Sequence, residues 1–320
     1  MNTTKRPDIS MPNIQTQQTD TGPAEGFGKT DISNTDESYI LSSDSSELDL
    51  KYLQISLRGA MREAFFRNGP FDFSVHLYPD EVDANSLDFM KSGLNTTSKV
   101  YVSTDSLGRT TKYLGEWNGD MREGRGIQVT FNNGINEDLS LSEHAFIYQG
   151  FWVDNLAHGK GRLIHHDGDS YEGSWEQGKA SGYGEYRHSD GTTFKGNWKE
   201  DLQEGFGEEQ WVDGSIYKGE YKNGCKHGKG IFCWSDSSVY EGEFNMNSIN
   251  GYGIYKWPDG RVYKGPWRNN KMEGEGIYTW PDGRVYKGFW HQSQQHGVGT
   301  YSEASGEEVV VLYKFGERVK

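Results

Sequence analysis

Aromatic residues and glycines recur along the chain in a fixed order, in which an aromatic residue, a glycine and a second aromatic residue occupy alternate positions. Seven copies of this pattern follow one another at steps of 23 residues, from Tyr148 to Tyr286, and an earlier copy begins at Tyr113. Side chains at alternate positions of a β-strand point to the same face, so each copy places two rings and a glycine on one side of a strand. The glycine leaves a slot between the rings, which a ring from a neighbouring strand can cover.

Each copy continues with a second pair of glycines and then with a turn signal. In the copy that begins at Tyr263, the second pair is Gly274 and Gly276, and the polar residues 268–273 separate it from the first strand. The turn signal is Asp-Gly in most copies, with Ser237 in place of the glycine in one of them. The pattern therefore predicts one β-hairpin per copy and an all-β fold, a single-layer antiparallel array of about eight hairpins.

The array is expected to span residues 99–306, with an insertion near 132–147 and a final capping strand at 307–320. Pro266 lies inside a predicted strand, where it cannot donate a ladder hydrogen bond. We therefore expect a β-bulge or interrupted pairing at this position.

The residues before the array have a different character. Residues 48–98 are predicted to form a small N-terminal cap, because apolar residues at helical spacing predict one amphipathic helix over 50–68 and apolar alternation predicts a strand over 71–77. Residues 1–47 are rich in Ser, Thr, Asp and Asn, and we expect them to be a disordered acidic leader.

Composition limits the kind of core and the partners that are possible. Apolar residues make up 33% of the chain, 42 residues are glycine, and 14% are aromatic, so we expect rings packed against glycines rather than a deep aliphatic core. The net charge of −14 disfavours nucleic-acid binding. Two cysteines cannot form a disulfide framework and no apolar run reaches the length of a membrane span, so we expect a cytoplasmic location.

The residues that could carry chemistry are too far apart to cooperate. His158, His227 and His296 precede the first glycine of their pairs, and three hairpins of two strands each separate one from the next by about 28 Å. One metal ion cannot bridge that distance. The turn aspartates recur about 9–10 Å apart, and turn formation explains them. We expect no catalytic residues, no metal site and no cofactor, hence no enzyme.

The ring, Gly-x-Gly and Asp-Gly spacing resembles the MORN repeat, the membrane occupation and recognition nexus motif, over residues 110–306. The resemblance implies a single-layer hairpin solenoid curved into a groove, with no chemistry of its own. Such arrays are found in scaffolds of cilia, of the cytoskeleton and of membrane junctions, and as accessory parts of some lipid kinases and methyltransferases. The sequence departs from the pattern at Tyr221 and Phe244, where Trp is usual.

The aromatic face is the candidate partner-binding groove. We expect one ring-lined face of a single-layer sheet to stay partly exposed to water, and a long apolar surface of this kind marks protein-binding sites. A helix or an extended segment of another protein could lie in it. The groove residues are Tyr148, Trp152, Tyr171, Trp175, Phe194, Trp198, Tyr217, Tyr221, Tyr240, Phe244, Tyr263, Trp267, Tyr286 and Trp290.

One stretch of the array is locally basic and forms a possible patch for an anionic partner. Weak contact with phosphoinositide headgroups or with acidic tubulin tails is expected there. Exposed final strands also favour a homodimer through the C-terminal repeats. The patch residues are Lys256, Arg261, Lys264, Arg268, Lys271, Arg284 and Lys287.

The sequence therefore favours a non-catalytic scaffold that binds partner proteins, in a cytoskeletal or a ciliary or flagellar assembly. Two alternatives stay open. The chain could be a peripheral phospholipid-binding adaptor at a membrane, or a regulatory subunit that positions a separate enzyme.

Overall fold

The computed structural model describes residues 44–45, 50, 53, 57–73, 97–132 and 145–319. The chain divides into two compact units. The N-terminal unit holds the described residues up to 168 together with 174–179, and the C-terminal unit holds 169–173 and 180–319. Among the described residues, no helix has the length and the apolar character needed to cross a bilayer.

Antiparallel strands make up the sheet of the N-terminal unit, and each pairs with the next along the chain. The division between the two units falls within β8 (Ser170–Glu176). The strands of the N-terminal unit are β3 (Thr97–Thr104), β4 (Arg109–Asn118), β5 (Met121–Asn132), β6 (Phe146–Val153) and β7 (Leu156–His165).

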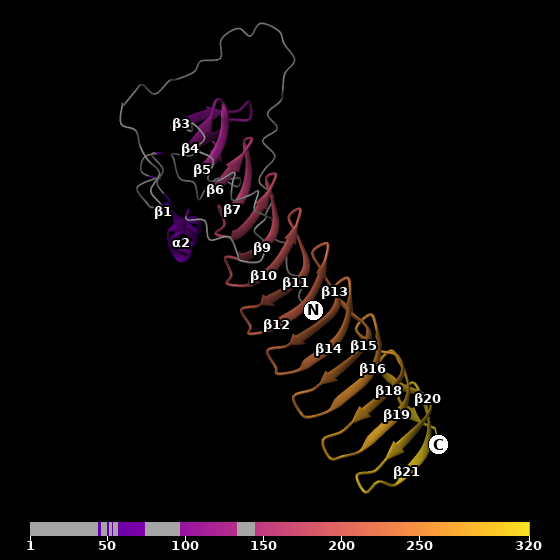
Figure 1. The fold of residues 1–320 in the computed structure, drawn as a ribbon. Helices are drawn as coiled ribbons and strands as arrows, with labels where there is room; N and C mark the ends of the chain where they lie inside the picture. The colour runs from indigo at the N-terminus through magenta and orange to yellow at the C-terminus, as the bar shows by residue number, and fades with distance from the viewer. Residues whose placement is uncertain are drawn as a thin grey trace. The chain divides into compact units, whose positions relative to one another are not determined.

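The C-terminal unit is also an antiparallel meander, in which hairpins stand side by side in chain order (Figure 1). The predicted all-β array of hairpins is confirmed. Its strands are β9 (Lys179–Arg187), β10 (Thr193–Lys199), β11 (Leu202–Gln210), β12 (Ile216–Lys222), β13 (Cys225–Cys233), β14 (Val239–Asn245), β15 (Ser248–Lys256), β16 (Val262–Arg268), β17 (Lys271–Met272), β18 (Gly274–Thr279), β19 (Val285–His291), β20 (Gln294–Ser302), β21 (Glu308–Lys314) and β22 (Glu317–Arg318).

Two kinds of turn connect the strands. Within a hairpin the turn has two residues with positive φ, as at Asn269 (48°) and Asn270 (65°), which is the combination that matches the twist of paired strands. Between hairpins the Asp-Gly signal closes the turn. Asp259 Oδ1 accepts the N–H of Arg261 at 3.1 Å, and Gly260 donates to the Trp257 carbonyl at 3.0 Å. The turn aspartates therefore act as turn residues, as their spacing predicts.

Pro266 does not interrupt its own strand, because β16 continues to Arg268 and Pro266 stays in register with Tyr252. The interruption falls on the other side, where the partner strand is split into β17 and β18 at Glu273. Proline has no N–H to offer that strand, so only the Pro266 carbonyl is used, and it accepts the Glu273 N–H at 3.0 Å.

The N-terminal cap contains one described helix, α2 (Gly59–Asn68). The prediction of one continuous helix over 50–68 is wrong: Leu50 is helical, but Arg58 is extended (φ −139°, ψ 167°) and Gly59 has a positive φ of 57°, so α2 begins only at Gly59. β1 (Asp44–Ser45) pairs with β2 (Phe71–Asp72), so two residues of the predicted leader form a bridge. The rest of the leader, the strand predicted beyond residue 73 and most of the insertion lie outside the described residues.

Apolar residues of the cap cover one face of the N-terminal sheet. This face is the one opposite the rings, since its residues alternate with the ring positions along β4 to β7. The cap contributes Leu50, Leu53, Met61, Ala64, Phe65, Phe71 and Phe73, and the sheet contributes Leu114, Ile127, Val129, Phe131, Ile147, Phe151 and Ile164.

Candidate functional site

The aromatic column is built by each tyrosine folding over the glycines of its own hairpin. A Cβ atom added to Gly265 would lie 2.6 Å from the hydroxyl oxygen of Tyr263, and one added to Gly276 would lie 2.5 Å from it. The slot beside Gly265 is thus filled from its own strand, whereas Gly276 in β18 is covered, as expected, by a ring of the neighbouring strand β16. Tyr263 then meets Trp267 edge to face with ring centroids 5.3 Å apart, and Trp290 of the next hairpin at 5.4 Å.

The expectation of a partly wet ring face is wrong, because these edge-to-face stacks close over one another. Each of the fourteen predicted groove residues is at most 7% exposed. Indole N–H groups add to the closure, as where Trp198 Nε1 donates to the Gly184 carbonyl at 3.2 Å. The partner-binding role of these rings stays a prediction, and their burial leaves them little surface to offer.

Tyr221, where the repeat pattern has Trp, belongs to a buried polar cluster that sequence reasoning missed. Its hydroxyl donates to Glu209 Oε2 at 2.9 Å, and the same oxygen lies 2.6 Å from Lys226 Nζ. Burial, reinforced by the Glu209 carboxylate, raises the pKa of Tyr221 well above its usual value. A signal existed in the sequence, since Glu209 stands at a position that holds Phe232 in the next hairpin and Tyr255 in the one after.

Of the three histidines of the column, His296 supports a turn, whereas the Nδ1 atom of His227 is buried without a hydrogen-bond partner among the described residues. His296 Nδ1 accepts the N–H of Phe315 at 3.3 Å, and Glu273, one hairpin earlier in this column, accepts the N–H of Gln292 at 2.9 Å. At Glu273 and His296 the side chain at this position therefore accepts a turn N–H. Across the described ranges, no three His, Cys, Asp or Glu side chains are grouped so that they could hold a metal ion.

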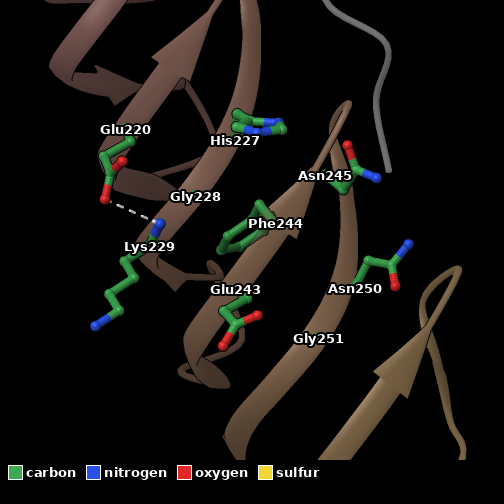
Figure 2. Close-up of a pocket in the computed structure, with 9 residues that line it drawn as sticks. All are labelled: Glu220, His227, Gly228, Lys229, Glu243, Phe244, Asn245, Asn250 and Gly251. Atoms are coloured by element: carbon green, nitrogen blue, oxygen red, sulfur yellow. Dashed lines mark hydrogen bonds between the residues drawn. The ribbon is translucent and has the colours of Figure 1, made fainter.

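An open depression of about 560 Å³ lies between neighbouring hairpins of the C-terminal unit (Figure 2). Its lining includes Glu220, Glu243, His227 and Lys229. The Glu220 carboxylate accepts the backbone N–H of Lys229 at 3.2 Å, so it is engaged in supporting the strand. The side chains that line the depression come from separate strands, and the Nδ1 atom of His227 is buried there without a hydrogen-bond partner in the part of the chain that the structure describes.

The predicted basic patch is divided by the structure. Arg261 and Arg284 are held at the turns, where each guanidinium Nε lies 2.6 or 2.7 Å from the aspartate two residues before it. Each also stacks on a tryptophan ring, with Arg261 5.4 Å from the Trp257 centroid. The other patch residues are exposed, namely Lys256, Lys264, Arg268, Lys271 and Lys287.

The face opposite the rings differs between the two units. In the N-terminal unit it lies under the cap, and cations on it bind the cap's backbone. Arg162 donates to the carbonyls of Gly69 at 2.7 Å and of Asn68 at 3.2 Å, at the C-terminal end of α2. Lys160 donates to the Asp72 carbonyl at 3.2 Å.

In the C-terminal unit the same face carries large apolar side chains in contact with solvent. Tyr252 is 50% exposed, Phe289 51% and Val298 59%. We call this surface the exposed face of the C-terminal unit. It comprises the outward residues of β15 to β21, including Tyr252, Ile254, Lys264, Ile277, Lys287, Phe289, Val298, Val310 and Leu312.

Comparison with known protein families agrees with this geometry. A search of curated proteins finds no match. The family model described as MORN repeat matches eight segments, each of which begins at the first ring of one copy of the pattern. The segments are residues 113–134, 148–170, 171–193, 194–216, 217–239, 240–260, 263–283 and 286–307.

Proposed function

The chain belongs to the MORN repeat family, and from that premise we propose that it is a non-catalytic scaffold that binds another protein through the exposed face of its C-terminal unit. MORN repeats generally mediate protein–protein or membrane-lipid interactions, and the family is generally non-catalytic. The setting we propose is a cytoskeletal or a ciliary or flagellar assembly, and this part rests on the family alone.

The observation that supports the proposal is the contrast between equivalent faces of the two units. In the N-terminal unit the face opposite the rings buries the apolar side of α2, including Met61 and Phe65. In the C-terminal unit the corresponding face leaves Tyr252, Phe289 and Val298 at least half exposed. Large apolar side chains exposed on one face are typical of a protein-binding site.

The buried rings are the weaker candidate for the partner's position. Tyr263 and Tyr286 have no exposed surface, so a partner would have to separate edge-to-face stacks before it could touch them. Each such stack contributes about 0.5–1.5 kcal/mol beyond area burial. We therefore place the partner on the opposite face, where Tyr252, Phe289 and Val298 are already exposed.

The test compares the partners captured by the wild-type chain and by a Tyr252→Ser/Phe289→Ser variant, after proximity labelling in the native cell. We expect the variant to keep its thermal midpoint and to lose specific partners. The matched control is Leu107→Ser/Val212→Ser, which removes two exposed apolar residues that lie at turns. Retention of every partner by the Tyr252→Ser/Phe289→Ser variant would overturn the proposal.

A second candidate function is a peripheral adaptor on an anionic membrane. Lys264 and Lys287 favour it, because they are exposed on an apolar face next to Phe289. Each basic residue near an anionic surface contributes about 1 kcal/mol. Flotation of the protein with vesicles that contain a phosphoinositide tests this function, and absence of co-flotation at moderate salt excludes it.

The homodimer through the C-terminal repeats stays a proposal. β21 carries Val310 (73% exposed) and Leu312, and after β20 it pairs only with the two residues of β22 among the described strands. An incompletely paired strand invites pairing with a second chain. Light scattering at micromolar concentration tests it, and a monomeric mass counts against the dimer.

A further inference from the structure

Two lysines on the exposed face of the C-terminal unit lack the carboxylate partners that equivalent lysines have. Lys195 Nζ lies 3.6 Å from Glu185 and Lys218 Nζ lies 3.0 Å from Glu208. One and two hairpins after Glu208, the corresponding positions hold Ile231 and Ile254. The substitution of isoleucine for glutamate along this column changes what the lysines that follow can contact.

Lys264 stands in register with Ile254 on one side and Ile277 on the other. Lys287 stands in register with Ile277 and Thr300. Within the described part of the chain, neither ammonium group lies within 4.0 Å of a carboxylate oxygen, and both side chains are exposed. The face thus presents two cations on an apolar background.

The spacing of these cations follows from the strand ladder. Lys264, Ile277 and Lys287 occupy one row across three neighbouring strands. Strands lie about 4.7–4.9 Å apart, so the lysine backbones are about 9.5 Å apart, with an isoleucine between them. Seven residues of an α-helix rise about 10.5 Å, so a helix that crosses the strands presents one heptad per hairpin.

The N-terminal unit shows what the face opposite the rings can hold. There, apolar sheet residues pack on Met61 and Phe65 of α2, and Arg162 donates to carbonyls at the end of that helix. The corresponding face of the N-terminal unit therefore already holds a helix against apolar side chains, with a cation bound to the helix end.

We propose that the exposed face of the C-terminal unit binds an amphipathic helix of a partner protein that crosses the hairpins and presents acidic side chains, seven residues apart, to Lys264 and Lys287. The apolar side of the helix packs on Ile277 and Phe289. This inference rests on the proposed function, because it assumes that the face is the protein-binding surface, and it adds the partner's chemistry.

Charge complementarity selects an acidic helix. The strands β15 to β19 bring Lys256, Lys264 and Lys287 to this face and contain one acidic residue, Glu275. Glu273, between β17 and β18, lies beside Phe289 and accepts the N–H of Gln292. The screening length at physiological salt is about 8 Å, so the nearby lysines act on the partner more strongly than the distributed charge of −14.

The experiment uses the full chain and a synthetic amphipathic helical peptide of four heptads, with glutamate at one position of each heptad and leucine at the positions that face the sheet. We expect the Lys264→Glu/Lys287→Glu variant to bind this peptide at least about tenfold more weakly, and a peptide with lysine in place of the glutamates to recover the affinity. The control, Lys199→Glu/Lys222→Glu, makes the same change in net charge on other hairpins and should bind as the wild type does.

The outcomes separate this inference from the function on which it rests. Equal peptide binding by the wild type and by Lys264→Glu/Lys287→Glu would overturn the acidic-helix inference. Co-flotation with phosphoinositide vesicles in the absence of peptide binding would overturn it in favour of a membrane surface. If native partners are lost with Tyr252→Ser/Phe289→Ser but kept with Lys264→Glu/Lys287→Glu, the result supports the protein-binding face and overturns the acidic-helix inference. If both variants keep them, the proposed function fails as well.

Discussion

Lys226 Nζ lies 2.6 Å from Glu209 Oε2, and the two side chains are only 12% and 6% exposed. This ion pair sits inside the aromatic column, with the lysine Nζ 4.6 Å from the centroid of the Trp211 ring. Tyr221 completes it through its hydroxyl. The pair explains why a tyrosine is accommodated where the repeat pattern has tryptophan, since the phenol oxygen reaches a carboxylate that the lysine neutralises.

Loss of one charge from this pair should be costly. Glu209→Gln leaves the Lys226 ammonium buried without its counter-ion, and we expect the free energy of unfolding to fall by about 3–5 kcal/mol. Urea denaturation measures it. The next hairpin suggests a matched control variant, because it has apolar residues at the positions of Glu209, Tyr221 and Lys226. These residues are Phe232, Phe244 and Ile249.

The triple variant Glu209→Phe/Tyr221→Phe/Lys226→Ile copies that hairpin and should recover stability to within about 1–2 kcal/mol of the wild type, since apolar replacements of buried ion pairs are often neutral or stabilising. A Glu209→Gln variant as stable as the wild type would show that the pair is not buried in solution.

The glycines under the rings should not tolerate a methyl group. In Gly230→Ala the new Cβ would lie 2.5 Å from the Tyr217 hydroxyl oxygen and 2.6 Å from its ring, so the stack must open. We expect a loss of about 2–3 kcal/mol in the free energy of unfolding, as for an overpacked core. Gly214→Ala is the control, because it has open space and only the strain of its φ of +87°, which costs about 1–2 kcal/mol. A loss in Gly230→Ala no larger than that in Gly214→Ala would contradict a large ring-contact cost, because Gly230 has no positive φ and so no backbone strain of this kind.

Ser237 should be replaceable by glycine with a gain in stability. It adopts φ 72° in a turn whose N–H donates to the Trp234 carbonyl at 2.9 Å, the geometry that glycine has in neighbouring turns. Because a left-handed conformation disfavours a side chain, Ser237→Gly should raise the free energy of unfolding by about 0.5–1 kcal/mol. Ser235→Gly, in the same turn but without positive φ, should give no gain. A gain in both variants would point to an effect on the unfolded chain.

Buried tyrosines should make the fold sensitive to alkali. Burial raises the pKa of Tyr286 to about 12, and it raises the pKa values of Tyr217, Tyr240 and Tyr263 as well. The unfolded chain releases these protons near pH 10 while the folded chain keeps them, so their contribution is complete below about pH 10 and is lost as pH rises. For Tyr286 the loss spans about pH 10 to 12, at up to about 1.4 kcal/mol per pH unit.

Urea denaturation between pH 8 and 12 measures this dependence. We expect a Tyr286→Phe variant to lose less stability across the upper part of that range than the wild type does. If the tyrosinate absorbance of the folded protein develops fully near pH 10 without loss of sheet, the rings are open to solvent and the prediction fails.

Much of the repeat could be read from local sequence. The period places Tyr263, Gly265 and Trp267 on one face whatever their neighbours are, because alternation along a strand is a property of the backbone. The turns could be predicted equally well, since Asp259 and Gly260 have turn preferences of their own. Even Ser237 could be recognised as a turn residue from its place in the period.

The rest depended on which strands lie beside one another. Glu209 and Lys226 are 17 residues apart, and only the pairing of hairpins brings them together. The sequence could not show that the rings would close over their own glycines and be buried, nor that α2 would lie on the opposite face, because both follow from packing across the sheet. By itself, then, the sequence determined the hairpins and the order of their side chains. The tertiary structure decided which face is sealed and which stays open, because burial depends on contacts between strands, which periodicity alone does not specify.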